Sequence, residues 1–153
     1  LSFLEVKKKN AADKTLKQRC EIPFLQDRLD GFESFVERHS LFRARDLEPS
    51  IGNSFGRITL IGIVSPERIT IDLNLSFTCQ GQQRSFAGVI VEVKQPRFSP
   101  RSPVMLALKA LRVRPISVSK YCVASSLLLP HVKLNLYRPK LRQLRSRVHD
   151  RAV

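Results

Sequence analysis

The sequence predicts an α+β domain in which antiparallel strands form a sheet or barrel and helices flank it. Segments of strand length alternate between apolar and charged residues, and Pro or Ser signals separate them from segments with helical spacing. The chain has 153 residues, of which 42% are hydrophobic, so it is long and apolar enough to bury one core. This composition excludes an intrinsically disordered chain.

The N-terminal segments predict a β-hairpin. Residues 3–9 alternate in part between apolar and charged side chains, and Lys7 lies on the charged face. After a polar turn, residues 15–22 repeat the pattern with Lys17 and Arg19 on the charged face. Two neighbouring strands that each have one charged face are typical of an antiparallel pair.

A helix, a loop and a strand are expected next. Pro23 is typical of the first turn of a helix, and apolar residues recur at helical spacing up to Arg38, which predicts a helix over 23–38. The turn-forming residues of 46–54 predict a loop that leads into a strand over 55–63.

Two further strands show the clearest alternation. Residues 68–77 predict one strand, and residues 89–94 predict another after a turn at Gln80. In the later strand, Glu92 and Lys94 lie on the face opposite the valines. The expected faces of 68–77 are Arg68, Thr70, Asp72 and Asn74 on one side and Ile69, Ile71, Leu73, Leu75 and Phe77 on the other.

Two helices are expected toward the C-terminus. Ser102 as N-cap and Pro103 at the first helical position predict a helix that runs to about Leu111. A second, short helix is expected to begin near Ser119 and to carry Lys120. We interpret Ser119 as the N-cap of this helix, although Ser before Lys is also compatible with a nucleophile and its amine base.

The chain is expected to form one domain over residues 1–132, followed by a basic tail over 133–153. The tail has seven Lys or Arg residues against one Asp and is interpreted as solvated, with nucleic acid or anionic lipid as alternative contacts. The longest stretch without Asp, Glu, Lys or Arg is 121–132, about half of what a bilayer-spanning helix needs. No transmembrane segment is therefore expected.

The charge balance favours an anionic partner. Lys and Arg total 27 against 13 Asp and Glu, which gives a formal charge of +14. The three Cys are far apart and form no C-x-x-C pair, which argues against a disulfide scaffold and a zinc site and predicts a reducing, cytoplasmic compartment. The chain has no Walker A motif, and its lack of Trp disfavours an RNA-binding module.

The charged strand faces allow two interpretations. In the first, an antiparallel sheet turns its charged face to water. In the second, a closed barrel turns that face inward, so that Lys and Arg line a cationic lumen for a phosphate chain and the helices at 23–38 and 102–127 cover its apolar outside. We expect Asp72 to pair with a neighbouring cation and regard metal binding as its alternative use.

Six motifs, in this order, resemble the VTC domain of polyphosphate polymerases, which belongs to the CYTH-like triphosphate tunnel superfamily. They are Phe3-Leu-Glu-Val-Lys7, Lys17-Gln-Arg19, Phe55-Gly-Arg57, Glu67-Arg-Ile-Thr-Ile-Asp72, Val91-Glu-Val-Lys94 and Ser119-Lys-Tyr-Cys122. Each motif alone is weak, and their order along residues 3–122 makes the resemblance specific.

The resemblance implies an antiparallel tunnel barrel that transfers the terminal phosphoryl group of a nucleoside triphosphate such as ATP to a growing polyphosphate chain. It also implies a divalent metal, Mn²⁺ or Mg²⁺, held by Glu92, and it leaves open a membrane-bound partner subunit and the oligomeric state. The implied phosphate-binding residues are Lys7, Lys17, Arg19, Arg57, Arg68, Lys94 and Lys120, and the implied catalytic residues among them are Lys7, Arg57 and Arg68.

The sequence departs from the family in two ways. Phe55 stands where the family usually has Tyr, so a hydroxyl that could reach a phosphate is missing. The family's first strands, with an R-x-R pair, would lie upstream of Leu1, so we expect an incomplete tunnel and activity that depends on the upstream strands. A triphosphate hydrolase with the same cationic face, and a non-catalytic module that binds polyphosphate or nucleic acid, are the alternatives to a polymerase.

Overall fold

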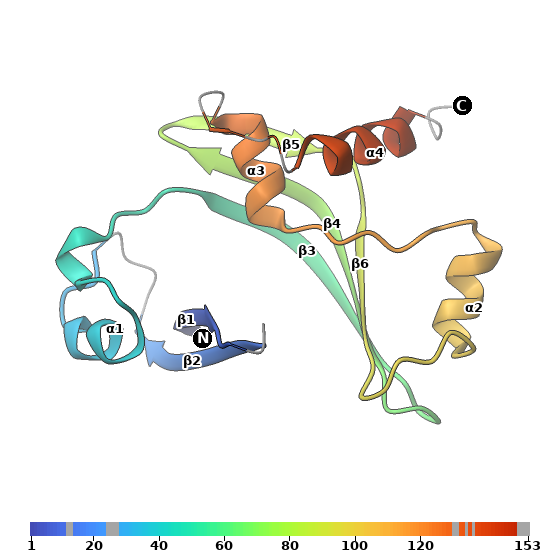
Figure 1. The fold of residues 1–153 in the computed structure, drawn as a ribbon, viewed down its shortest axis with the longest axis horizontal. Helices are drawn as coiled ribbons and strands as arrows, with labels where there is room; N and C mark the ends of the chain where they lie inside the picture. Colours follow the sequence, from blue (N-terminus) through green and yellow to red (C-terminus); the bar gives the residue numbers. More distant parts are fainter. Residues whose placement is uncertain (12–13, 24–27, 130–131, 134, 136, 150–153) are drawn as a thin grey trace. The chain divides into compact units, whose positions relative to one another are not determined.

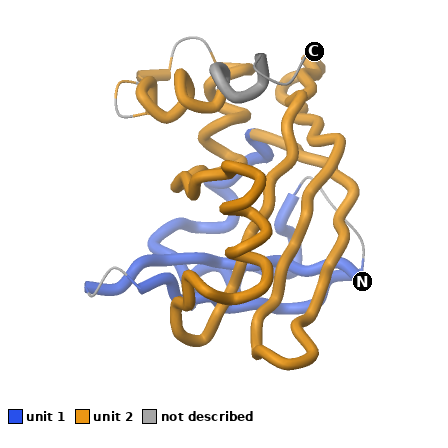
Figure 2. The backbone as a smooth tube through the Cα atoms, turned by 90° about the vertical axis from the view of Figure 1, so that its right-hand side faces the viewer, with its two compact units in different colours: residues 1–50 blue, residues 51–153 orange. Residues whose placement is uncertain are grey.

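The computed structural model describes residues 1–11, 14–23, 28–129, 132–133, 135 and 137–149. It shows an α+β protein with antiparallel sheets, as predicted (Figure 1). The chain divides into two compact units, which comprise residues 1–50 and 51–153 and are coloured separately in Figure 2. Each unit is described by itself below.

The predicted hairpin forms in the first unit. Strands β1 (Ser2–Lys9) and β2 (Thr15–Ile22) pair antiparallel, with Lys7 opposite Lys17. The backbone N–H of Lys14 donates a hydrogen bond of 2.9 Å to the side chain of Asn10, which supports the turn. The charged and apolar faces therefore alternate as the sequence indicates.

The helix predicted over 23–38 is wrong in its first part. Helix α1 spans Glu33–His39, and residues 28–32 form bends and turns, while 24–27 lie outside the described residues. Gly31 has φ of +85°, a left-handed conformation that ends any helix entering from the N-terminal side. Only the last apolar positions of the pattern, such as the buried Val36, belong to the helix. A short 3-10 helix, η1 (Ala44–Asp46), follows.

The second unit is built around one long central strand. This strand, β4 (Arg68–Cys79), pairs antiparallel with β3 (Gly52–Ile61) on one side. On its other side β5 (Gln82–Phe86) and β6 (Ile90–Lys94) pair with its second and first halves. The sequence predicted all of these except β5, whose polar residues lack alternation. The β4–β5 turn is tight, and Gln80 and Gly81 both have positive φ, as in a two-residue hairpin.

A β-bulge at Asn74 changes the faces of β4. Ser54 pairs with Ser76, but Gly56 pairs with Leu73, so β4 contains one extra residue here, and Asn74 has φ of +53°. Beyond the bulge, Leu75 lies on the same face as Asp72. The prediction that Leu75 and Phe77 share a face with Ile69, Ile71 and Leu73 is therefore wrong.

Helix α3 (Lys120–Leu128) packs on the face created by the bulge. Its residues Val123, Ala124 and Leu128 form the core with Leu75, Phe77 and Cys79, and Phe55 and Ile90 pack against that core. Phe55 is two residues from Arg57, and Ile90 pairs with Asp72, so α3 covers one end of the charged face. The barrel interpretation, in which the helices at 102–127 cover the apolar outside of the strands, is wrong for α3. On that apolar side, Ile58 and Leu60 are about half exposed.

The remaining helices are α2 (Pro103–Ala110) and α4 (Arg138–His149). Helix α2 begins as predicted, with the Ser102 side chain as N-cap accepting a hydrogen bond from the backbone N–H of Met105. Ser119 precedes α3 at the N-cap position, but its side chain makes no capping hydrogen bond. Helix α4 lies in the predicted basic tail, and Leu144 packs against the core.

The described strands form a two-stranded and a four-stranded sheet, and no closed barrel is present among them. The tunnel architecture therefore stays a prediction. Within the same described ranges, none of the helices combines the length and the apolar character needed to span a bilayer.

Candidate functional site: a cationic sheet face

A row of cationic residues lies on one face of the β3–β4–β6 sheet. Arg57 pairs with Asp72, and Arg68 pairs with Lys94. Because residues paired in an antiparallel sheet share a face, and alternate residues of one strand do too, Arg57, Arg68 and Lys94 lie on the same side. Helix α3 adds Lys120 to this side, through contact with Asp72. The structure thus brings together four of the predicted phosphate-binding residues.

Asp72 is the centre of this row. Its side chain is 1% exposed and accepts hydrogen bonds of 2.6 and 2.9 Å from Nε and Nη2 of Arg57. Lys120 Nζ lies 2.5 Å from Asp72 Oδ2. The Arg57 guanidinium, more than any other group, lowers the pKa of Asp72 to about 2, with Lys120 adding to it and burial opposing it. The same pairing raises the pKa of Arg57. The predicted pairing of Asp72 with cations is confirmed.

The aromatic ring of Phe55 contacts the same two cations. The Arg57 Cζ atom lies 5.0 Å from the ring centroid, and Lys120 Nζ lies 4.5 Å from it. These cation–π contacts use the face of the ring, which Phe and Tyr share. A Tyr, which the resemblance implies at this position, would make the same contacts and add a hydroxyl.

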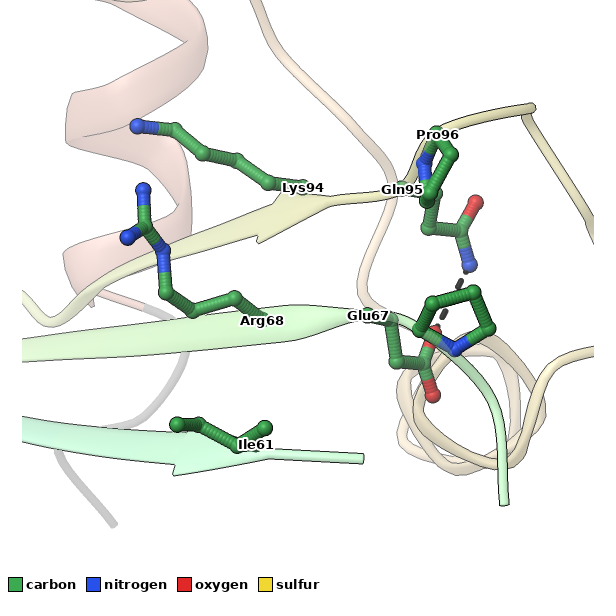
Figure 3. A pocket seen from close by; sticks show the side chains of 7 residues that line it. Ile61, Glu67, Arg68, Lys94, Gln95 and Pro96 are labelled. Atoms are coloured by element: carbon green, nitrogen blue, oxygen red, sulfur yellow. Dashed lines mark hydrogen bonds between the residues drawn. The ribbon is translucent and has the colours of Figure 1, made fainter. Parts of the chain in front are cut away.

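The other end of the row borders a shallow, open pocket of about 420 Å³, called the cavity below. Figure 3 shows Arg68 and Lys94 on neighbouring strands with their charged ends directed the same way. Lys94 also makes a 3.1 Å ion pair with the half-exposed Glu92. Both cations are thus accessible at the cavity and form a second place where an anion could bind.

Glu67 closes one side of this cavity. It is buried and accepts a hydrogen bond of 2.8 Å from Nε2 of Gln95 (Figure 3). The same Nε2 also donates to Ser102 Oγ at 2.8 Å. The Gln95 bond is the main reason that the pKa of Glu67 is lowered. Sequence reasoning gave Glu67 no role beyond its motif, because its partner Gln95 comes from another strand end.

The other predicted cations lie on the hairpin of the first unit. Lys7, Lys17 and Arg19 share one exposed face of β1 and β2. Glu5 lies among them, 2.9 Å from Lys7 Nζ and 3.9 Å from Arg19 Nε, and its hydrogen bond with Lys7 is the main cause of its lowered pKa. The structure therefore groups the predicted residues into two sets, one in each unit.

The predicted metal ligand is an isolated carboxylate in the described part of the chain. Glu92 faces Lys94, and Asp72 is fully engaged by its two cations. No group of three or more His, Cys, Asp or Glu side chains gathers among the described residues. A metal that relied on protein ligands alone would not fit here, whereas Mg²⁺ usually takes one or two carboxylates together with substrate phosphates and water.

Thr70 is a residue of this face that sequence reasoning did not single out. It lies between Arg68 and Asp72 on β4 and is 7% exposed. Its hydroxyl is buried and has no hydrogen-bond partner in the described structure. Alternation places Thr70 on the charged face, but only the packed structure shows that it is buried there.

We predict that Thr70→Val raises the stability of the protein. A buried hydroxyl without a partner costs about 1–3 kcal/mol of desolvation, and Val has nearly the same shape. Urea unfolding followed by circular dichroism should therefore show a higher midpoint for the variant. Thr59→Val is the matched control, because Thr59 pairs with Thr70 across the sheet but is exposed. A lower midpoint for Thr70→Val would show that the hydroxyl has a stabilising partner.

Comparison with known proteins adds a family match to this geometry. The family model described as the VTC domain matches residues 1–129. Neither the curated proteins nor the solved structures gave a match to the chain. The matched range includes β1 to β6 and the cationic residues of both units.

Proposed function

The chain belongs to the VTC domain family, which connects it with inorganic polyphosphate, and we propose that it transfers the terminal phosphoryl group of a nucleoside triphosphate to a polyphosphate chain. The observation that carries the proposal is the grouping of Arg57, Arg68, Lys94 and Lys120 on one sheet face.

This face suits phosphoryl transfer for a simple chemical reason. The reaction needs little covalent chemistry from the protein, and its rate depends on positioning and on neutralising the charge of the transferring group. Arg57 and Arg68 offer planar forks for phosphate oxygens, and Lys94 and Lys120 offer compact charges. A chain of phosphates carries repeated negative charge, so a row of cations matches it better than a single site does.

Asp72 positions two of these cations for substrate binding. It holds Arg57 and Lys120 in fixed positions against Phe55, so little side-chain freedom is lost when a phosphate arrives. Arg57 donates from Nε and Nη2 to Asp72, so its other N–H groups can donate to a phosphate. The Arg57 side chain is 41% exposed and can therefore be reached by the substrate. Asp72 is in this proposal a positioning residue rather than a catalytic one.

A divalent metal would be held by Glu92 together with phosphate oxygens of the substrate. When bound, Mg²⁺ or Mn²⁺ would neutralise charge on the phosphates. Lys94 lies 3.1 Å from Glu92 and can exchange its carboxylate partner for a phosphate oxygen, which would leave Glu92 available.

A second candidate function is the binding of polyphosphate without catalysis. It is favoured by the isolation of Glu92 from other carboxylates in the described residues. The cationic face serves this function equally well, because binding needs the charges but not a positioned metal.

Phosphorus NMR of the full-length protein with ATP and Mn²⁺ tests the proposal. The expected result is the growth of signals from the inner phosphates of long chains, with loss of these signals when a chelator removes the metal. Free phosphate as the only product would instead assign a triphosphate hydrolase. Bound polyphosphate with no turnover of ATP would assign the non-catalytic module.

A further inference from the structure

The turn between β3 and β4 exposes apolar side chains to water. Ile63 and Val64 are fully exposed, at 101% and 99%, and Ile61 at the end of β3 is 74% exposed. A single exposed aliphatic residue is common, but adjacent aliphatic residues at the tip of a hairpin are a feature to be explained.

The backbone of this turn is held firmly. The N–H of Gly62 donates to the carbonyl of Glu67 at 2.8 Å, and the N–H of Glu67 donates to the carbonyl of Ser65 at 2.7 Å. A side chain at Gly62 would collide with the Ser65 carbonyl, so the turn needs glycine here. Ile63 and Val64 are thus presented to solvent by a defined turn.

The segment after β6 adjoins the same turn. Gln95 donates to Glu67 at the base of the turn and to Ser102, and it accepts from the backbone N–H of Ser99 at 2.9 Å. These bonds bring 95–102 to the lower end of the sheet in Figure 1, beside the β3–β4 turn. This segment carries Phe98, which is 73% exposed.

The charges around this end are almost all positive. Arg97 and Arg101 are exposed in the segment after β6, and Arg68 and Lys94 line the neighbouring cavity. Two carboxylates lie nearby: Glu67 is buried and bonded to Gln95, and Glu92 pairs with Lys94 at 3.1 Å, so neither is paired with Arg68, Arg97 or Arg101 in the described structure. The end of the sheet therefore combines an apolar tip with a cationic surround.

We propose that this end of the second unit docks on a membrane surface that contains anionic lipids. Ile63, Val64 and Phe98 enter the boundary between headgroups and acyl chains, and the arginines contact the lipid phosphates. A narrow projecting tip fits a soft bilayer better than a flat protein partner, because a stable protein interface needs a broad complementary area. The proposal concerns attachment and does not depend on the phosphoryl-transfer activity.

A single tryptophan can report the insertion, because the chain has no Trp of its own. In the full chain, Val64→Trp should show a blue shift of its emission with vesicles of phosphatidylcholine and phosphatidylserine. Leu41→Trp is the matched control, since Leu41 is fully exposed in the first unit, and its emission should not shift. Equal shifts for the two variants would overturn the proposal.

Vesicle co-sedimentation measures the contribution of the tip to affinity. The double variant Ile63→Ser with Val64→Ser should bind the same anionic vesicles about tenfold more weakly or worse, whereas Leu41→Ser should bind like the wild type. The double variant Arg97→Gln with Arg101→Gln should weaken binding by roughly tenfold, because each arginine is attracted to the anionic lipids and adds to the binding affinity. Far-ultraviolet circular dichroism confirms that each variant is folded.

Four outcomes would contradict membrane docking by this tip. The first is failure of the wild type to bind anionic vesicles, and the second is equal binding to vesicles of phosphatidylcholine alone, which would exclude the charge contribution. Unchanged binding by the Ile63→Ser and Val64→Ser double variant would assign the vesicle affinity to other basic residues, such as those of α4. A Val64→Trp emission that shifts only when a second protein is added would make the tip a protein-binding site.

Discussion

Replacing Asp72 with Asn is expected to lower the free energy of unfolding by about 2–3 kcal/mol. The carboxylate is 1% exposed and holds both Arg57 and Lys120, so its loss leaves two like charges facing each other beside Phe55. Removing one partner of a buried ion pair costs about 3–5 kcal/mol. The expected value is smaller because Arg57 remains 41% exposed and can be solvated. Urea unfolding at neutral pH measures the difference.

Asp46→Asn is the matched control for this substitution. Asp46 also binds an arginine, with Arg43 Nε at 2.7 Å, but both side chains lie at the surface. Exposed ion pairs contribute little because water solvates the charges nearly as well. We therefore expect the control to unfold like the wild type. A similar loss for both variants would mean that the burial of Asp72 adds nothing to its ion pairs.

The stabilisation by Asp72 should disappear in acid. Its pKa is lowered from 3.8 to about 2 in the folded protein, so the folded state prefers the charged form. The contribution of Asp72 to the free energy of unfolding is present in full above pH 4. It is lost as the pH falls through about 2, because the Asp72 carboxylate then takes up a proton in the folded state as well as in the unfolded state. At about 1.4 kcal/mol per pH unit, this lowering of the pKa corresponds to about 2–3 kcal/mol of stability. The difference between wild type and Asp72→Asn should shrink over this range, and a constant difference would contradict the pairing.

The strands could be predicted because alternation is a local property of the sequence. Residues 68–77 alternate so regularly that β4 was expected with its correct start, yet the faces of its second half were assigned wrongly. One extra residue at the Asn74 bulge reverses the faces, and it becomes visible only in the register of β4 with β3. The bulge is what places the apolar core and the cationic row on one face of the same strand.

The candidate site was predictable only where a single strand carries it. Alternation placed Arg68 and Asp72 on one face, and the register adds Arg57 beside them. The contact of Lys120 with Asp72 depends on how α3 packs, which no local pattern specifies. The early part of the predicted helix over 23–38 was wrong for a related reason, since apolar spacing does not reveal the left-handed Gly31.

Arg68→Ala is expected to lower turnover by about 10²-fold if the row of cations performs phosphoryl transfer, which is the usual size of a lost transition-state contact. In the described structure Arg68 makes no ion pair with a carboxylate, so the substitution should leave stability nearly unchanged. Lys7→Ala in the hairpin is expected to act in the same direction. The measurement is the initial rate of polyphosphate formation from ATP, together with the unfolding midpoint.

Two controls separate this effect from a general loss of positive charge. Arg84→Ala removes an exposed arginine of β5, which pairs with Phe77 in the second half of β4, whereas Arg57, Arg68 and Lys94 lie along its first half, so this variant should keep most of the activity. Replacing both Lys140 and Arg142 with Gln takes away more positive charge than either single substitution and leaves Leu144 against the core, and it should also reduce turnover far less than Arg68→Ala. Because the proposal depends on where the charges lie and not on their number, equal losses from Arg68→Ala and from this double variant would contradict it.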